Sequence, residues 1–314
     1  MSRRAPATGD RFQAWIQAEL GDAAERWLEG QAAYVAEGVT AFRWNTLGGA
    51  SPRATVSLEA RSVPGLPDAG WVPADARETL TRHPEAGRSF YIQSLSSQLA
   101  GAVLVPDERP GVEVLDLAAA PGGKTLDLLQ RLGSGSHVAA VEPSKPRFHK
   151  LRRHVEAAVM CRGDQPHATL RLFMSDGRSI GRKVPGRFDA VLLDTPCSAE
   201  ARIRPDEPST SRGVSPKKVR RLASLQKVLL RNAIEAVRPG GEVLYCTCTA
   251  NSIENEAVVA DALAGGEVLQ VDISDRLPTR SGLDLGEGFD GVGWRVWPSV
   301  WGPAFYLALL RRAA

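Results

Sequence analysis

The chain has few cysteines, and their spacing argues against the sites that cysteines most often build. It contains four cysteines in 314 residues, without repeated Cys-x-x-Cys or Cys/His spacing. A disulfide framework and a structural zinc site are therefore not expected, whereas a reducing, cytoplasmic environment is. The five histidines show no ligand spacing either, so no metal site is predicted. The cysteines are Cys161, Cys197, Cys246 and Cys248.

Long apolar segments are also missing. The first residues lack the apolar stretch of a signal peptide, and no run approaches the ~18 apolar residues of a membrane-spanning helix. Export and membrane association are not expected. With 43% hydrophobic and 24% charged residues, the chain can bury one sizeable core and a smaller module. The sequence does not fix the oligomeric state, and a monomer is compatible with it.

No charge of one sign dominates, since the net charge is only +3, but the basic residues are clustered. Five of nine positions are basic between Lys145 and Arg153, and nine Lys and Arg between Arg202 and Arg231 face only Asp206 and Glu207. Such clusters are typical of proteins that bind a phosphate backbone. The alternative is that they are solvated outer faces of amphipathic helices.

The hydrophobic pattern divides the chain near Val112. Residues 11–36 carry apolar side chains at helical spacing, and short strands with Gly/Pro turns follow. Residues 1–110 are therefore predicted to form a small α+β module. In residues 111–314, near-continuous apolar strands alternate with helices, which indicates an α/β fold with a mostly parallel, Rossmann-like sheet. The segments 198–213 and 279–293 are predicted to be loops.

In such a sheet, ligands bind beyond the carboxyl ends of the strands. The first predicted strand ends in Asp116 and is followed by Ala118, Ala119, Ala120, Pro121, Gly122, Gly123 and Lys124. The glycines permit close approach of a ligand, and the next helix presents backbone N–H groups. A nucleoside triphosphate site is disfavoured, because Ala118 occupies the position of the first P-loop glycine.

Acidic residues follow the next two strands. Glu142 is placed to accept hydrogen bonds from a ribose diol, and Asp176 from an exocyclic amino group such as that of adenine. Each also fits an ordinary turn, because Pro143 follows Glu142 and Gly177 follows Asp176. Their succession after a glycine-rich loop favours a nucleoside-containing cofactor.

Two further apolar runs each end in a cysteine: one reads VLLDTPCS at 191–198, the other VLYCTCT at 243–249. A thiol beside a strand-end carboxylate can add to an electron-poor pyrimidine carbon while the acid supports the ring nitrogen. A second thiol could assist release. The alternative is that Cys197 and Cys248 are small buried hydrophobic residues.

The order of these motifs resembles the Sun-domain RNA cytosine-5 methyltransferases of the RsmB/RsmF type. The resemblance extends from Ala41 to Arg311. Its markers are AFRWNTL at 41–47, FYIQSLSS at 90–97, DLAAAPGGKT at 116–125, AVEPSKPRF at 140–148, SDGR at 175–178, DTPCS at 194–198, PGGEVLYCTCT at 239–249 and ENE at 254–256.

The resemblance implies S-adenosyl-L-methionine as cofactor, held by residues 118–124, by Glu142 at the ribose, by Asp176 at the adenine and by Asp194. It also implies that Cys248 attacks C6 of an unpaired or flipped cytosine, and that Asp194 hydrogen-bonds N3. Cys197 would then assist release of the methylated base. Ribosomal RNA is the expected substrate and partner, with transfer RNA as the alternative. The module of residues 1–110 would then contribute to RNA binding.

The chain departs from the family pattern at three places. The loop after Ser198 reads AEARIR, at 199–204, where many members have glycines, and the pair Gln93-Ser94 stands where many have Gln-Asp. Cys246 replaces the usual serine, and strand alternation puts it on the same face as Cys248. The sequence leaves two other functions open, namely a DNA cytosine-5 methyltransferase with Cys197 as nucleophile and a non-catalytic ribosome-assembly factor.

Overall fold

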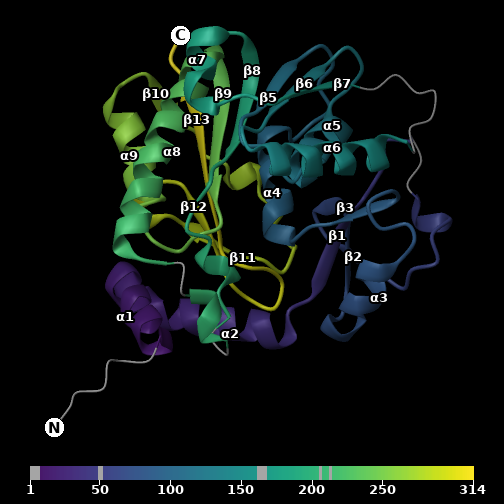
Figure 1. The fold of residues 1–314 in the computed structure, drawn as a ribbon, viewed down its shortest axis with the longest axis vertical. Helices are drawn as coiled ribbons and strands as arrows, with labels where there is room; N and C mark the ends of the chain where they lie inside the picture. Colours follow the sequence, from purple (N-terminus) through teal and green to yellow (C-terminus); the bar gives the residue numbers. More distant parts are fainter. Residues whose placement is uncertain (1–7, 49–51, 161–167, 205–206, 212–213) are drawn as a thin grey trace.

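The computed structural model describes residues 8–48, 52–160, 168–204, 207–211 and 214–314 (Figure 1). Cys161, His167 and part of the second basic cluster, including Asp206 and Arg212, lie outside these residues. The described residues form two sheets, a small one near the N-terminus and a large one that occupies most of the chain after residue 112.

The N-terminal part is the α+β arrangement predicted from the sequence. Its sheet has the order β2-β3-β1-β4, and all its pairings are antiparallel. The elements are α1 (Thr8–Leu20), α2 (Ala24–Glu37), β1 (Thr40–Trp44), β2 (Arg61–Val63), β3 (Leu66–Val72), α3 (Arg77–Arg82) and β4 (Phe90–Ile92).

The helical spacing of residues 11–36 is divided between two helices. A 3-10 turn over Gly21–Ala23 separates α1 from α2. Gly21 has φ +53, a left-handed conformation that glycine adopts without the steric cost of a Cβ. The chain therefore bends at this point, and both helices pack against the large domain at the lower end of the view in Figure 1.

The large sheet confirms the α/β, Rossmann-like prediction. Its order is β11-β12-β13-β9-β8-β5-β6-β7, with β10 paired to β13. The neighbours among β7, β6, β5, β8 and β9 are parallel, and β13 joins β9 in the antiparallel sense. The strands are β5 (Glu113–Asp116), β6 (His137–Val141), β7 (Thr169–Phe173), β8 (Phe188–Asp194), β9 (Val237–Thr247), β10 (Val268–Gln270), β11 (Asp284–Glu287), β12 (Trp294–Trp297) and β13 (Phe305–Arg312).

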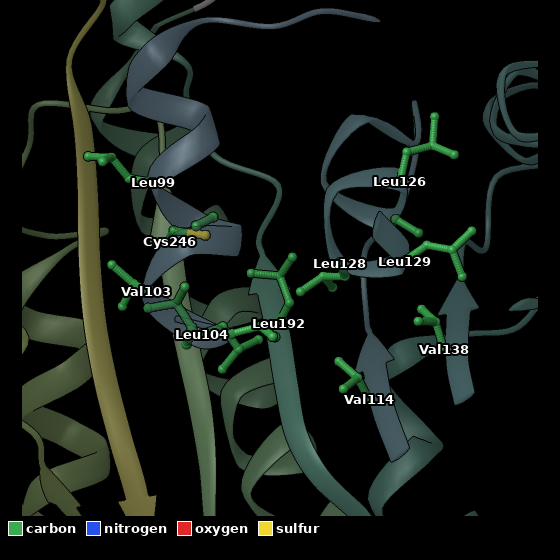
Figure 2. Close-up of a cluster of buried hydrophobic side chains, with 14 of the residues drawn as sticks. Leu99, Val103, Leu104, Val114, Leu126, Leu128, Leu129, Val138, Leu192 and Cys246 are labelled. Carbon is green, nitrogen blue, oxygen red and sulfur yellow. The ribbon is translucent and has the colours of Figure 1, made fainter. Parts of the chain in front are cut away.

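Helices cover both faces of this sheet, as the near-continuous apolar strands predicted. One face packs on helices that contribute Leu99, Leu128 and Leu151, and the other on helices that contribute Ile180, Leu230 and Val258. Figure 2 shows part of the first cluster, between α4 and α5 and the strands below them. The helices are α4 (Leu95–Leu104), α5 (Gly123–Arg131), α6 (Lys145–Val159), α7 (Ile180–Lys183), α8 (Pro216–Ala236) and α9 (Glu256–Ala264).

The prediction that residues 279–293 form only a loop is wrong. Four of them, Asp284–Glu287, form β11, which pairs antiparallel with β12 at the edge of the sheet. Glycine and aspartate have low strand propensity, so local preference does not produce this strand. The strand forms because β12 offers it backbone hydrogen bonds. Residues 198–213, where described, contain only short 3-10 turns.

A buried ion pair joins the small sheet to the large domain. Arg43 on β1 lies 3.6 Å from Asp127 on α5, and their side chains are 2% and 0% exposed. Arg43 also donates to the carbonyl of Gly123 and to Gln130. Burial lowers the pKa of Arg43, an effect that the Asp127 carboxylate opposes. A charge buried this deeply requires its partner.

We expect Asp127→Asn to lower the free energy of unfolding by about 3 kcal/mol, because it leaves the Arg43 charge buried without its counter-ion. Urea denaturation followed by circular dichroism measures this change. The matched control is Glu78→Gln, which removes the carboxylate of an exposed pair with Arg82 and should cost less than about 1 kcal/mol. Equal effects of the two substitutions would contradict a special role for the buried pair.

Candidate functional site

The carboxyl ends of the parallel strands bring most of the predicted residues to one edge of the large sheet. Asp116 ends β5, Asp194 ends β8, and Cys248 directly follows β9. Glu142 and Asp176 follow β6 and β7. Because neighbouring parallel strands end at the same edge, residues far apart in sequence meet there.

The two cysteines of the predicted site are in contact. The Sγ atoms of Cys197 and Cys248 are 3.4 Å apart, and both residues are partly exposed. Cys246 is separate from them, because its side chain is fully buried against Leu99 and Val103 in the cluster of Figure 2. Strand alternation alone could not distinguish Cys246 from Cys248, but burial does.

The three thiols differ in acidity, because Cys197 and Cys248 are in contact and Cys246 is buried apart from them. The hydrogen bond from Cys197 lowers the pKa of Cys248, and the positive charges of Arg202 and Lys124 act in the same direction. The same hydrogen bond and burial raise the pKa of Cys197. Burial raises the pKa of Cys246. Cys248 is therefore the thiol most readily converted to the nucleophilic thiolate.

A buried hydrogen-bond network holds the loops that carry the two cysteines. Glu200 accepts hydrogen bonds from Thr249 Oγ1 (2.7 Å) and from the backbone N–H groups of Ala250 and Asn251. Glu254 accepts from the backbone N–H of Ser198 (3.0 Å). The segment after Cys197 is thereby tied to the segment after Cys248.

Burial raises the pKa of Glu254, which the hydrogen bonds from Ser198, Asn251 and Gln226 partly offset. No site role was predicted for Glu200 or Glu254. Glu254 belongs to the ENE motif at 254–256. The acidic residues of this motif were the feature of the sequence that could have indicated a role in the site.

An ion pair between Lys124 and Asp194 lies beside the two thiols. Lys124 Nζ is 2.7 Å from Asp194 Oδ2, and its ammonium group lies over the ring of Phe305. Burial alone would lower the pKa of Lys124, but the Asp194 carboxylate outweighs it and the pKa is raised. The lysine therefore stays charged, and its charge lies next to the thiol pair.

Two adjoining cavities open at this edge, and they share Ser94, Ser97, Lys124, Asp194 and Arg202. The smaller has a volume of about 230 Å³ and is lined by the predicted loop. It will be called the loop cavity. The larger, about 610 Å³, contains Cys248 and extends to α2 and α3, and it will be called the thiol cavity. The predicted residues in the loop cavity are Ala118, Ala119, Ala120, Pro121, Gly123, Lys124 and Asp194.

Glu142 and Asp176 lie at the same sheet edge but do not line the loop cavity. The carboxylate of Glu142 is buried and accepts a hydrogen bond from the Ser144 N–H (2.9 Å). Asp176 pairs with Arg178, which lowers the pKa of Asp176. Gly122, at φ +112, precedes α5 and does not line the cavity either.

Sequence reasoning missed Tyr91, Ser94 and Ser97, which also line the loop cavity. All three belong to the FYIQSLSS motif, so the signal was present but no role was attached to it. A Cβ at Gly123 would lie 2.7 Å from Tyr91 Cε1. The glycine is therefore required for the tyrosine ring to pack against the loop.

Within the described residues, no group of three or more His, Cys, Asp or Glu side chains is arranged to hold a metal ion. The described helices also include none with the length and apolar character needed to cross a membrane.

Ala199, next to the cysteine loop, has φ +61 and ψ +42, the left-handed region that favours glycine. We expect Ala199→Gly to raise the free energy of unfolding by up to about 1 kcal/mol, because relief of the steric cost exceeds the added chain entropy. Thermal denaturation measures the change. As a control, Ala201→Gly, at a position with negative φ by virtue of its 3-10 turn, should destabilise. Destabilisation by both would show that Ala199 is not strained.

The contact between Cys197 and Cys248 predicts how the alkylation of Cys248 depends on pH. Because the Cys197 hydrogen bond lowers the pKa of Cys248, Cys197→Ala should raise that pKa and shift alkylation of Cys248 by iodoacetamide to higher pH. Cys197→Ser retains a hydrogen-bond donor and should shift the profile less. Mass spectrometry of the modified residue gives the rates. An unchanged profile in Cys197→Ala would exclude the thiol contact as the cause.

A family model and a curated relative both relate this chain to ribosomal RNA methyltransferases. Residues 102–311 match the family model described as 16S rRNA methyltransferase RsmB/F. The ribosomal RNA small subunit methyltransferase F of Salmonella paratyphi B is 34% identical over 261 residues, which cover 80% of this chain and 51% of that protein. The chain thus spans about half the length of this relative.

Two solved structures share the fold over nearly the whole chain. NSun6 from Pyrococcus horikoshii with SFG superposes with a TM-score of 0.74 at 19% identity, covering 96% of this chain and 97% of that one. A methyltransferase homolog from the same organism gives a TM-score of 0.70 at 23% identity, covering 98% and 100%. At these identities the likeness shows the fold alone.

The family match covers more than half of the chain and includes the strand ends, the loop over residues 118–124 and both cysteines. The RsmB/F proteins are S-adenosyl-L-methionine-dependent methyltransferases, so the predicted cofactor is confirmed. The chain belongs to the 16S rRNA methyltransferase RsmB/F family.

Proposed function

We propose that this chain methylates C5 of a cytosine in ribosomal RNA, in the cytoplasm, through a covalent adduct with Cys248. The observation that carries the proposal is the contact between Cys197 and Cys248, with the Lys124–Asp194 pair beside it at the junction of two cavities. A thiol of lowered pKa therefore faces a cavity for a substrate and adjoins a cavity for a cofactor.

The residues around the loop cavity fit S-adenosyl-L-methionine, which supplies an electrophilic methyl group. Asp116 accepts from Thr125 Oγ1 (2.7 Å) through Oδ2, while its buried Oδ1 makes no hydrogen bond with the described residues. Burial raises the pKa of Asp116 to about 7. This buried oxygen is available to a ligand donor, and residues 118–124 with Asp194 would hold the group.

The roles assigned to the two cysteines follow from the difference between their pKa values. The Cys248 thiolate forms a bond to C6 of the cytosine, and the electron pair displaced from the C5–C6 bond makes C5 nucleophilic. As the thiolate adds, N3 takes up a proton from solvent, and the resulting N3–H donates to the carboxylate of Asp194, which the charged Lys124 holds in place. After methyl transfer a water molecule takes the C5 proton, the electron pair of the C5–H bond re-forms the C5–C6 double bond, Cys248 leaves C6 as a thiolate, and N3 returns its proton to solvent.

Cys197 is the candidate for assisting this release. It keeps its proton, because the contact with Cys248 and burial raise its pKa. A protonated thiol 3.4 Å from the attacking sulfur can return a hydrogen bond to Cys248 as Cys248 leaves the ring. The two cysteines thus differ in function because they differ in protonation.

An RNA substrate is supported by the family match and by the shape of the site. A cytosine stacked inside a helix does not reach a thiol that lines a cavity, so the target base must be unpaired or flipped out. Transfer RNA is the alternative substrate. A DNA cytosine methyltransferase would use Cys197 as its nucleophile, which the higher pKa of Cys197 disfavours.

We expect Cys248→Ala to abolish both methyl transfer and the covalent adduct, and Cys197→Ala to leave a trapped protein–RNA adduct, because release is impaired. Adducts are detected as a shifted band in denaturing gels after incubation with unmodified small-subunit ribosomal RNA. Bisulfite sequencing of RNA from cells with and without the gene locates the modified cytosine.

The reverse result, an adduct with Cys248→Ala and none with Cys197→Ala, would assign the nucleophile to Cys197. Cys246→Ser is the matched control, because that side chain is buried away from the thiol cavity and should leave adduct formation intact. Absence of methyl transfer by the wild-type protein on ribosomal RNA, transfer RNA and DNA would favour the non-catalytic assembly factor.

A further inference from the structure

The proposed chemistry uses only part of the thiol cavity. Cys248, Lys124 and Asp194 line it near the loop cavity, while α2 forms another wall with Gln31, Tyr34 and Val35. These α2 positions are spaced three and four residues apart, so they lie on one face of the helix. With about 610 Å³, the cavity is in the range of about 300–1,000 Å³ that holds ligands of several rings. It therefore has room for more than the target base.

The α2 wall is firmly attached to the cysteine loop. Gln31 is 1% exposed, and its Nε2 donates to the carbonyls of Ala201 (3.1 Å) and Ile203 (2.7 Å). Trp27, one turn earlier, packs with Ala201 and Ile203 in the same buried cluster. The helix thus keeps a fixed position relative to Cys197, and any side chain it presents to the cavity is preorganised.

Tyr34 is the aromatic side chain that α2 contributes to the cavity, and it is half-buried. The chain turns at Gly38, whose N–H donates to the Tyr34 carbonyl (3.0 Å). A Cβ at Gly38 would lie 2.7 Å from Tyr34 Cδ2, so the backbone passes directly against the ring. The ring is packed on this side, while Tyr34 still lines the cavity.

Two cations of the same cavity have no ion-pair partner among the described residues. Lys124 pairs with Asp194, and Arg204 lies 3.3 Å from Glu207. The exposed side chains of Arg77 and Arg202 make no such pair in the described part of the chain. Arg202 lies on a 3-10 turn fixed by Glu200, and its N–H donates to Ala199. An aromatic ring beside unpaired guanidinium groups is the combination that binds single-stranded nucleotides.

We propose that the α2 side of the thiol cavity is a second nucleotide subsite, in which Tyr34 stacks on the base next to the target cytosine and Arg77 and Arg202 bind the flanking phosphates. This subsite rests on the proposed RNA methyltransferase function and deepens it. It makes the N-terminal helices part of substrate recognition, although they lie outside the residues matched by the family model. The stacked neighbour would hold the strand while the target base enters the site.

The test measures equilibrium binding of a short fluorescein-labelled single-stranded RNA of mixed sequence by fluorescence anisotropy, without methyl transfer. We expect Tyr34→Ala to raise the Kd by roughly tenfold and Tyr34→Phe, which keeps the ring, to change it by less than about twofold. Arg77→Ala and Arg202→Ala should each reduce the slope of log K against log salt by about 0.7, the value for one phosphate contact on a single strand.

The controls separate recognition from folding. Binding of S-adenosylhomocysteine, measured by calorimetry, should be unchanged in Tyr34→Ala, which shows that the fold is intact. Arg82→Ala removes an exposed arginine that pairs with Glu78 on α3 and does not line the cavity. Its salt slope should equal that of the wild type.

Equal RNA affinities for Tyr34→Ala and Tyr34→Phe would overturn the stacking role, and unchanged salt slopes for Arg77→Ala and Arg202→Ala would overturn the phosphate contacts. These failures are distinguishable from failure of the proposed function. If the binding effects appear but no cytosine is methylated, the subsite stands as an RNA site and the proposed catalysis is wrong. If methylation occurs and the binding effects are missing, only the subsite is wrong.

Discussion

The site depends on two buried carboxylates that fix the loops after β8 and β9. Glu200 accepts the N–H groups of Ala250 and Asn251, and Glu254 accepts the N–H of Ser198. Both side chains are fully buried, so each unpaired acceptor or donor would carry a large desolvation cost. The loops therefore have little freedom to separate. The 3.4 Å contact between Cys197 and Cys248 is a consequence of this constraint, and so is the difference between their pKa values.

The N-terminal helices extend this constraint beyond the sheet. Trp15 on α1 donates to Glu200 (3.2 Å), and Gln31 on α2 donates to two carbonyls of the same loop. The small domain is thus attached at two places, through these helices and through the buried Arg43–Asp127 pair. One attachment sets the wall of the thiol cavity, and the other lies next to the glycine-rich loop. The thiol cavity, the glycine-rich loop and the two thiols consequently belong to one connected structure.

Much of the fold could be predicted because its signals are local. The alternation of apolar strands with helices after residue 112 gave the parallel sheet, and Asp116, Asp194 and Cys248 were correctly placed at strand ends. The strand over Asp284–Glu287 could not be predicted, because its hydrogen bonds come from β12 and its own residues favour turns. Glu200 was also missed, because an acidic residue in a loop looks exposed until its partners from α1 and from the segment after β9 are known.

The sequence by itself determined the sheet edge at which Asp116, Asp194 and Cys248 lie, since strand periodicity and strand-end residues are properties of the chain. It also supplied the motifs that identify the family. Only the tertiary structure separated the surroundings of Cys246 from those of Cys248, because alternation puts both on one face and burial under α4 removes Cys246 from the cavity. It alone also showed that α2 reaches that cavity, because a contact between residue 31 and residue 203 depends on packing across the whole chain.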